Sequence, residues 1–346
     1  MDNMPLVSVI VVNHSSGRYI SRCLSSVLDS DYSKIELTVV DNGSTDGSIE
    51  LVEKLYGKDT RVKIIRNKTN LGPAVGRNIG ASLAKGKYLV FLDDDTEVES
   101  QWLTEAIKTM DSDSTIGGAQ CKLLLMGKRD QFDYAGDYLS RYGFLVQRVD
   151  FGTTDEGQLD RVAEIFSAKS AGMIVQRHAF EDIKGFDEDY FIYMEETDLC
   201  WRIWLNGYKV VFLPTSVVYH DFGRALKLSS KRTKFLAKYH GTKNYITTLL
   251  KNLECRNLLK ILPIHVSLWV GILLWHVIGG RLSEANHIKR GILYNLIGLR
   301  HVWAKREAIQ SSRKVPDRQI MPRIMKSKPL TYFYRKLTYS GSGWRA

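Results

Sequence analysis

A short apolar segment that ends in three consecutive carboxylates is the feature that most constrains the possible fold of this chain. Residues 88–92 are apolar or aromatic, and Asp93, Asp94 and Asp95 follow them directly. An apolar run of strand formers is typical of a buried strand in an α/β sheet, where ligands bind at the carboxyl ends of the strands. Because successive strand residues point to opposite faces, Asp93 and Asp95 are expected to point the same way. Two such carboxylates can hold Mg²⁺ or Mn²⁺, although a solvated acidic turn before a helix is an alternative explanation.

The segments before this strand alternate between strand and helix patterns. Strands are expected at 5–12, 35–40 and 62–65, with helices ending near 28, beginning near 48 and covering 74–84. This order predicts a mostly parallel, doubly wound α/β sheet. Asn13 and Asp41 follow strand ends, where they could hold a nucleoside, but 41–47 also fits an ordinary turn with a helix cap. No G-x-G-x-x-G follows the first strand, which disfavours a dinucleotide fold.

The next part of the chain has a weaker pattern. Strands are expected at 119–125, 170–176 and 210–213, and the irregular stretch 127–169 is expected to face the substrate. A helix is expected from Glu195, with Glu195, Glu196 and Asp198 in its first turn. These acids could include a general base or could simply complement the helix dipole. His220 follows the last strand, and a lone histidine of this kind is usually structural.

Six motifs occur in one order along the chain: VSVIVVNH, VVDNGSTDGS, NLGPAVGRNIG, FLDDDTE, GFDEDYFIYMEETDLCWR and VVYHDFG. In this order they resemble the family 2 inverting glycosyltransferases of the GT-A fold, of the bacterial and archaeal cell-surface type, over roughly residues 5–223. The resemblance implies a nucleotide-diphosphate sugar donor, with UDP, dTDP or GDP as the nucleotide, and a divalent cation, Mn²⁺ or Mg²⁺. It also implies a glycan or polyprenyl-linked acceptor.

The resemblance also implies roles for individual residues. The donor site would contain Asn13, Asp41, Arg77, Asn78, Asp93 and Asp94. The metal ligands would be Asp95, Asp93 and His220. Glu196 would be the catalytic base, and because the family usually has Asp at this position, Glu195 remains a competing candidate.

The chemistry of an inverting transfer suits these residue types. One carboxylate takes the proton of the acceptor hydroxyl, and a cation offsets the charge of the leaving diphosphate. Processive members of the family carry Q-x-x-R-W after the base, whereas here Ile203 and Trp204 follow Arg202, which favours the addition of a single sugar. The alternative, a sugar-nucleotidyltransferase, would need a basic Gly-rich loop after the first strand. Residues 13–19 supply just one Lys or Arg, Arg18.

Positive charge is concentrated in the last third of the chain. Residues 231–346 contain 23 Lys and Arg against 4 Asp and Glu, so the net charge of +11 leaves −8 on residues 1–230. A basic segment suits an anionic membrane surface, while the acidic remainder argues against a nucleic-acid partner. A non-enzymatic adaptor that uses only the basic segment would leave the six motifs unexplained.

Residues 261–280 carry no charge and lie between Lys260 and Arg281. As a helix they could just span a bilayer, but two basic flanks favour a monotopic or re-entrant arrangement aided by 288–303. A buried helical pair is the alternative. We therefore predict a catalytic domain at 1–230, a helical, membrane-associating region at 231–310 and a basic surface arm at 311–346.

The expected location is the cytoplasmic face of the cell membrane, peripheral or monotopic, or otherwise the cytoplasm. The four cysteines lie far apart without metal-ligand spacing and are expected to be reduced thiols. Residues 6–12 are too short for the apolar region of a signal peptide and are better explained as a first strand.

Overall fold

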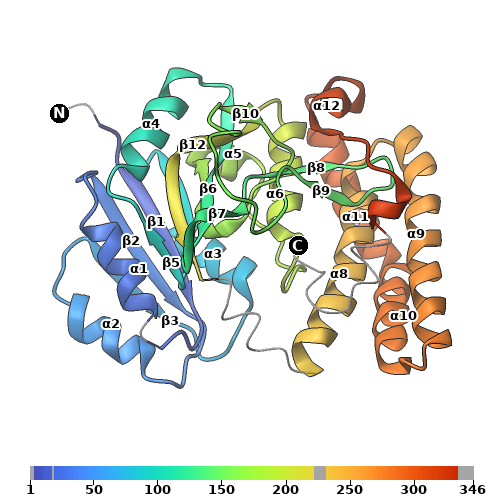
Figure 1. Cartoon of the computed structure of the whole chain (residues 1–346), viewed down its shortest axis with the longest axis horizontal. Helices are drawn as coiled ribbons and strands as arrows, with labels where there is room; N and C mark the ends of the chain where they lie inside the picture. Colours follow the sequence, from blue (N-terminus) through green and yellow to red (C-terminus); the bar gives the residue numbers. More distant parts are fainter. Residues whose placement is uncertain (1–3, 18, 222–230, 334–346) are drawn as a thin grey trace.

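The computed structural model describes residues 4–17, 19–221 and 231–333 of the 346-residue chain. Its centre is a ten-stranded sheet in the order β10-β12-β6-β11-β4-β1-β2-β3, with β5 paired to β12 and β7 paired to β6 (Figure 1). These strands are β1 (Val7–Asn13), β2 (Ile35–Asp41), β3 (Val62–Arg66), β4 (Tyr88–Asp93), β5 (Thr96–Val98), β6 (Ile116–Leu125), β7 (Lys128–Tyr134), β10 (Ala163–Glu164), β11 (Met173–Gln176) and β12 (Lys209–His220). A separate hairpin pairs β8 (Asp137–Leu139) with β9 (Leu145–Gln147).

The helices come in two groups along the chain. The first group is α1 (Tyr19–Leu28), α2 (Ser48–Tyr56), α3 (Pro73–Ser82), α4 (Trp102–Ser112), the 3₁₀ turn η1 (Ser170–Gly172), α5 (Arg177–Asp182) and α6 (Glu195–Leu205). The second group is α8 (Lys231–Asn252), α9 (Cys255–Ile278), α10 (Leu282–Ile297), α11 (Leu299–Ser312) and α12 (Asp317–Ile324). The second group lies to one side of the sheet, with α8 nearer to it than α9 (Figure 1).

The predicted α/β architecture is confirmed, but the sheet is mixed. Strands β1 to β4, β6 and β12 run in one direction, and β11 lies antiparallel between β4 and β6. The reversal is possible because no helical crossover precedes β11, and only such crossovers favour parallel strands. The stretch 127–169 is not irregular throughout, since it contains β7 to β10.

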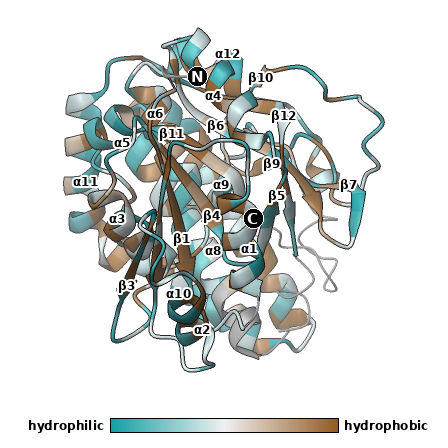
Figure 2. Cartoon of the chain, turned by 90° about the vertical axis from the view of Figure 1, so that its left-hand side faces the viewer, coloured by the Kyte–Doolittle hydropathy of each residue, from teal (hydrophilic) through white to brown (hydrophobic). Residues whose placement is uncertain are grey.

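The two faces of the sheet bury two separate cores. Tyr88, Val90 and Leu92 of β4 belong to the core shared with α1, α2 and α4, whereas Leu89 and Phe91 belong to the other core. This division follows from the alternation of side chains along a strand. Central strands β1 and β4 are hydrophobic along their length, as expected when both faces are covered (Figure 2). The sheet is thus doubly wound.

Strand register brings the polar strand ends together. Asn13 pairs with Asp41 across β1 and β2, and Val12 pairs with Asp93 across β1 and β4. The carboxyl ends of these parallel strands therefore meet at one edge of the sheet, as the sequence predicted.

The structure corrects one prediction about the C-terminal region and adds detail to another. Residues 288–303, which were expected to aid membrane attachment, belong to two helices, because Gly298 separates α10 from α11. The described part of the predicted surface arm is instead packed: Ile320 and Ile324 are buried, and Arg323 pairs with Glu164. The apolar side chains at helical spacing on α12 explain this docking. The predicted boundary at 230 and the final residues 334–346 lie outside the described residues.

Helix α9 has the length and apolar composition needed to cross a membrane, and it is the one helix of the described residues that meets both criteria. Only 28% of its most apolar 18-residue window is buried. A core helix of a soluble protein would be mostly buried, so the predicted apolar segment is real but largely uncovered.

Close packing of α3 against β1 depends on Gly80. A Cβ at this position would clash with Cγ2 of Ile10, which is fully buried. We predict that Gly80→Ala lowers the free energy of unfolding by roughly 1–3 kcal/mol, because overpacking outweighs the better helix propensity of alanine. Urea denaturation measures the change. Gly271→Ala is the matched control, since a Cβ there meets nothing within 4 Å; equal effects of the two variants would contradict the prediction.

Candidate active site

The acidic segment after β4 is a turn. Asp93 ends the strand, Asp94 and Asp95 form the turn, and β5 begins at Thr96. Asp93 and Asp95 do come together, but the turn brings them there rather than the alternation of a strand. Together with His220 they offer three ligand atoms that all lie within 4.8 Å of one another. Asp94 instead accepts a hydrogen bond of 3.2 Å from the backbone N–H of His14.

His220 is held in place by two carboxylates. Its Nδ1 lies 2.8 Å from Oδ2 of the buried Asp133, and its Nε2 lies 3.3 Å from Oδ1 of Asp95. A carboxylate can only accept, so Nδ1 donates to Asp133 and Nε2 faces the acidic turn. Burial alone would lower the pKa of His220, but the hydrogen bonds to Asp133 and Asp95 outweigh it and hold the pKa well above its ordinary value.

Sequence reasoning missed Asp133. It lies on β7 inside the stretch predicted to be irregular, and pairing of β7 with β6 brings it beside β12, which carries His220. A carboxylate that orients a histidine in this way is typical of metal sites. No local sequence pattern marks it, because the contact joins residues 87 positions apart.

The residues of this cluster fit a hard divalent cation. Two carboxylates and one imidazole nitrogen are ligands that Mn²⁺ accepts, and the carboxylates also suit Mg²⁺. Among the described residues this is the group of acids and histidines with a suitable separation. The local field also favours positive charge, as the raised pKa of His220 indicates.

Arg77 of α3 connects this cluster to the acids of α6. Its guanidinium lies 3.2 Å from Asp93, 3.1 Å from Glu195 and 3.6 Å from Glu196. It also donates to the hydroxyl of Ser170 on η1, and only 5% of Arg77 is exposed. A donor contact by Arg77 stays a prediction; the structure shows its guanidinium between Asp93 and the two glutamates of α6.

The two glutamates at the start of α6 have different environments. The Glu195 side chain is 3% exposed, while that of Glu196 is 16% exposed. Burial and the charge of Glu196 raise the pKa of Glu195 to about 8, although Arg77 opposes the shift. A carboxyl group that holds its proton at neutral pH cannot serve as a base there. Glu196 accepts a 2.8 Å hydrogen bond from Ser170 Oγ and is the better candidate.

The turn that leads into α6 is strained. Tyr193 and Met194 have φ of 69° and 70°, the left-handed region that non-glycine residues rarely adopt. Each residue costs about 1–2 kcal/mol in this conformation. Such strain persists where surrounding contacts enforce it, and here it occurs immediately before the two glutamates.

Two residues predicted to contact the donor make hydrogen bonds within the protein, and their donor contacts stay predictions. Asn13 is fully buried, its Nδ2 donates to Asp41 at 2.8 Å, and its Oδ1 accepts from Ser16. Asn78 bonds through its amide to both the N–H and the carbonyl of Phe186, so it ties α3 to the loop before α6. Both amides therefore hold segments around the site in place. A nucleotide contact by Asp41 stays a prediction; its carboxylate now accepts from Asn13 and Ser44.

A mixed sheet of this order, with an acidic turn, a histidine and a pair of glutamates at the carboxyl edge, defines the GT-A class of fold. A sequence model described as "Glycosyl transferase family group 2" matches residues 88–300, and one described as "Glycosyl transferase family 2" matches residues 8–147. The chain belongs to glycosyltransferase family 2.

Individual relatives agree with this assignment. An uncharacterized glycosyltransferase of Haemophilus influenzae is 41% identical over 31% of this chain and 43% of its own length. Glycosyltransferase AglE of Haloferax volcanii is 28% identical over 65% of this chain and 70% of its own length. The aligned segment spans less than half the length of the first five curated relatives.

A solved structure supports the fold over most of the chain. The mannosyltransferase PcManGT of Pyrobaculum calidifontis, in complex with GDP-Man and Mn²⁺, has a TM-score of 0.54 at 18% identity. The match covers 90% of this chain and 86% of that one.

The environment of Glu195 leads to a pH prediction. Its pKa is raised from 4.5 to about 8 in the folded protein, so the stability due to its protonated form is complete below about pH 4.5 and is lost as the pH rises through 8. Glu195→Gln keeps a neutral side chain at every pH. We predict that wild type loses stability relative to Glu195→Gln between about pH 5 and pH 8, with a constant difference above about pH 9.

Urea denaturation at several pH values, without added divalent cation, measures this difference. The control is Glu156→Gln, because Glu156 is exposed, and its curve should run parallel to that of wild type. Parallel curves for wild type and Glu195→Gln would show that Glu195 is ionised in the folded protein.

Proposed function

We propose that this protein transfers one sugar from a nucleotide-diphosphate sugar to a hydroxyl group of a glycan or polyprenyl-linked acceptor, with inversion at the anomeric carbon. The observation that carries the proposal is the direct link between two sets of groups. Asp93 of the proposed metal-ligand cluster and Glu196 of α6 both lie within hydrogen-bond distance of Ser170 Oγ, at 3.1 and 2.8 Å, and both face Arg77. A site for the leaving group and a base for the nucleophile are thus joined.

Glu196 is the proposed base. As the acceptor oxygen attacks the anomeric carbon, its proton passes to the Glu196 carboxylate, and the bond from that carbon to the diphosphate oxygen breaks. This single displacement needs no covalent intermediate with the protein. Ser170 and Arg77 orient the carboxylate, since each contacts its Oε1. Orientation of this kind accounts for much of the rate gain of a positioned base.

Asp93, Asp95 and His220 are the residues that would hold a divalent cation, with Asp133 orienting the histidine. When bound, Mn²⁺ or Mg²⁺ supplies positive charge beside the diphosphate. The complex of PcManGT with GDP-Man and Mn²⁺ supports a sugar nucleotide and a cation as ligands of this fold. The sugar-nucleotidyltransferase alternative gains no support, because the family models and the relatives point to glycosyltransferases.

Two variants separate the two halves of the proposed site. We predict that Asp95→Ala abolishes stabilisation by nucleotide and Mn²⁺, because it removes a metal ligand, whereas Glu196→Gln keeps this stabilisation and loses transfer by roughly 100-fold or more. Thermal unfolding with UDP, dTDP, GDP and CDP, each with and without Mn²⁺, measures binding. Turnover is then measured with sugar derivatives of the nucleotide that binds, in assays of sugar release and of sugar transfer.

Glu195→Gln is the matched control for the base. It should retain transfer within several-fold, because Glu195 is buried against Arg77. Near-normal turnover of Glu196→Gln together with an inactive Glu195→Gln would show that the base is Glu195 and not Glu196. No thermal shift with any nucleotide would remove the support for a sugar-nucleotide donor.

The outer face of α9 is the proposed membrane-facing surface. The exposed positions from 263 to 278 on this helix carry no charge, and they include Ile264, Val270, Leu274 and Ile278. Exposed basic residues lie nearby along the chain, at Arg256, Lys260, Lys289 and Arg290. An uncharged face beside basic residues suits the surface of an anionic bilayer. Such a location, on the cytoplasmic face of the cell membrane, would fit an acceptor carried on a lipid.

We predict that the protein co-sediments with vesicles containing phosphatidylglycerol, more weakly at high salt and more weakly with phosphatidylcholine alone. The double variant Val270→Glu/Leu274→Glu should lose this binding, because it places charge on the apolar face. Leu55→Glu is the control, since Leu55 on α2 is exposed to the same extent as Leu274. Failure of wild type to bind either vesicle at low salt would contradict the proposed surface.

A further inference from the structure

The turn before the proposed base is held from outside the sheet. Phe191–Met194 leads into α6, and Tyr193 and Met194 both lie in the left-handed region. Asn244 of α8 donates through Nδ2 to the carbonyl oxygens of Ile192 at 2.9 Å and Tyr193 at 2.7 Å. Asn244 is fully buried, and it comes from a helix that begins beyond residue 230.

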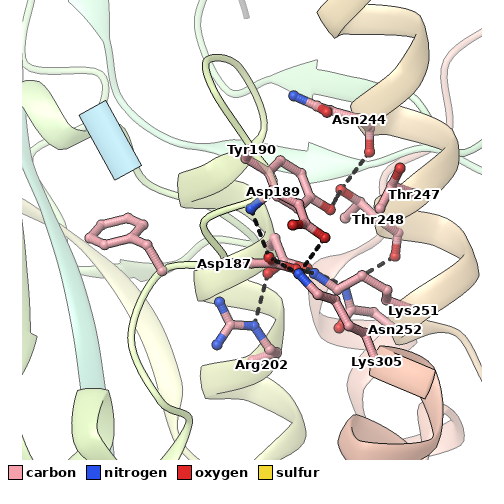
Figure 3. A network of polar contacts seen from close by, with 12 residues as sticks. Asp187, Asp189, Tyr190, Arg202, Asn244, Thr247, Thr248, Lys251, Asn252 and Lys305 are labelled. Atoms are coloured by element: carbon pink, nitrogen blue, oxygen red, sulfur yellow. Dashed lines mark hydrogen bonds and ion pairs between the residues drawn. The ribbon is translucent and has the colours of Figure 1, made fainter. Parts of the chain in front are cut away.

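The same helix also fixes the first turns of α6 (Figure 3). Lys251 is 1% exposed, its Nζ lies 2.8 Å from Asp198 on α6, and it also pairs with Asp187 in the preceding loop. Asn252 donates to Asp198 at 2.9 Å. Asp198 is fully buried and lies two residues after Glu196, so these contacts fix the position of the helix that carries the base.

A third set of contacts secures the loop between Phe186 and the strained turn. Thr248 of α8 shares a 2.6 Å hydrogen bond with the hydroxyl of Tyr190, and Lys243 donates to the carbonyl of Asp189 at 2.8 Å. Lys305 of α11 pairs with both Asp187 and Asp189 (Figure 3). The loop, the turn and the start of α6 are therefore all bound to α8 and α11 by buried or half-buried polar groups.

We propose that Asn244 is a positioning residue for Glu196, and that α8 is thereby part of the catalytic apparatus. This inference rests on the proposed function, because it acts through the base assigned there. Asn244 touches neither donor nor acceptor in this assignment. Its two hydrogen bonds stabilise the left-handed turn, and the turn sets the direction from which Glu196 enters the site. A displacement of about 1 Å of a base is enough to cost up to roughly 100-fold in rate.

The test compares two alanine variants of one helix. Asn244→Ala should lower kcat by roughly 10- to 100-fold, with the dissociation constant of the nucleotide sugar in the presence of Mn²⁺ changed by less than about threefold. Thr247→Ala is the matched control. Thr247 is also buried on α8, but its hydroxyl contacts Asn295 of α10 rather than the turn, so kcat should change by less than about threefold.

A double variant separates positioning from general loss of structure. In a Glu196→Gln background, Asn244→Ala should lower the residual rate by less than about threefold, because the group that it positions is already absent. Additive effects of the two substitutions would overturn the inference, as would equal losses of kcat in Asn244→Ala and Thr247→Ala. Thr248→Val serves if Asn244→Ala does not fold. It keeps the side-chain volume, removes the bond to Tyr190 and should lower kcat with unchanged donor affinity.

The outcomes distinguish the inference from the proposed function. If Glu196→Gln transfers sugar normally, both the assignment of Glu196 as the base and the positioning role of Asn244 are overturned. If Glu196→Gln is inactive while a folded Asn244→Ala is fully active, the positioning role alone is overturned.

Discussion

The site depends on the ion pairs that the buried guanidinium of Arg77 makes with the carboxylates around it. It lies among carboxylates from β4 and α6, and the Ser170 hydroxyl bridges the same groups. A guanidinium that is 5% exposed is costly unless it is paired, and three carboxylates near one cation exceed the charge that it can balance. Burial and the charge of Glu196 together raise the pKa of Glu195 to about 8, although Arg77 opposes the shift. One buried cation thus connects α3, β4, η1 and α6, while the deeper burial of Glu195 makes the two glutamates unequal.

The contacts of the two glutamates suggest how Glu196, the proposed base, can replace the aspartate that is usual in the family. A glutamate in place of aspartate carries one more methylene and has more freedom to move. The hydrogen bond from Ser170 removes part of that freedom, because it fixes Oε1 of Glu196 on the side of Asp93. Glu195 lies closer to Arg77, at 3.1 Å, and is almost completely buried. The longer side chain is accommodated because its end is held.

Local pattern in the sequence was sufficient for the first four strands and for the position of the acidic residues at the edge of the sheet. Apolar runs located β1 to β4, and the triple Asp after β4 located Asp93 and Asp95 at the proper edge. Contacts between distant segments were not predictable in this way. Asp133, Ser170 and the full role of Arg77 depend on β7 and on the antiparallel β11, and neither their direction nor their register is encoded locally. The internal hydrogen bonds of Asn13 and Asn78 were not predictable either, because their partners Asp41 and Phe186 lie 28 and 108 positions away along the chain.

The C-terminal helices differ in polarity between their outer and inner sides. Outward, α9 is apolar and uncharged from 263 to 278; inward, α8 buries polar side chains, among them Thr242, Asn244, Thr248, Lys251 and Asn252. A helix that only packed on a sheet would bury apolar residues. Polar residues are buried on α8 because it faces a loop whose carbonyls and carboxylates need partners. Removing α8 would take away Lys251 and Asn252, two partners of Asp198, and would leave the carbonyls of the turn before α6 without Asn244, so α8 contributes directly to the structure of α6 and its preceding turn.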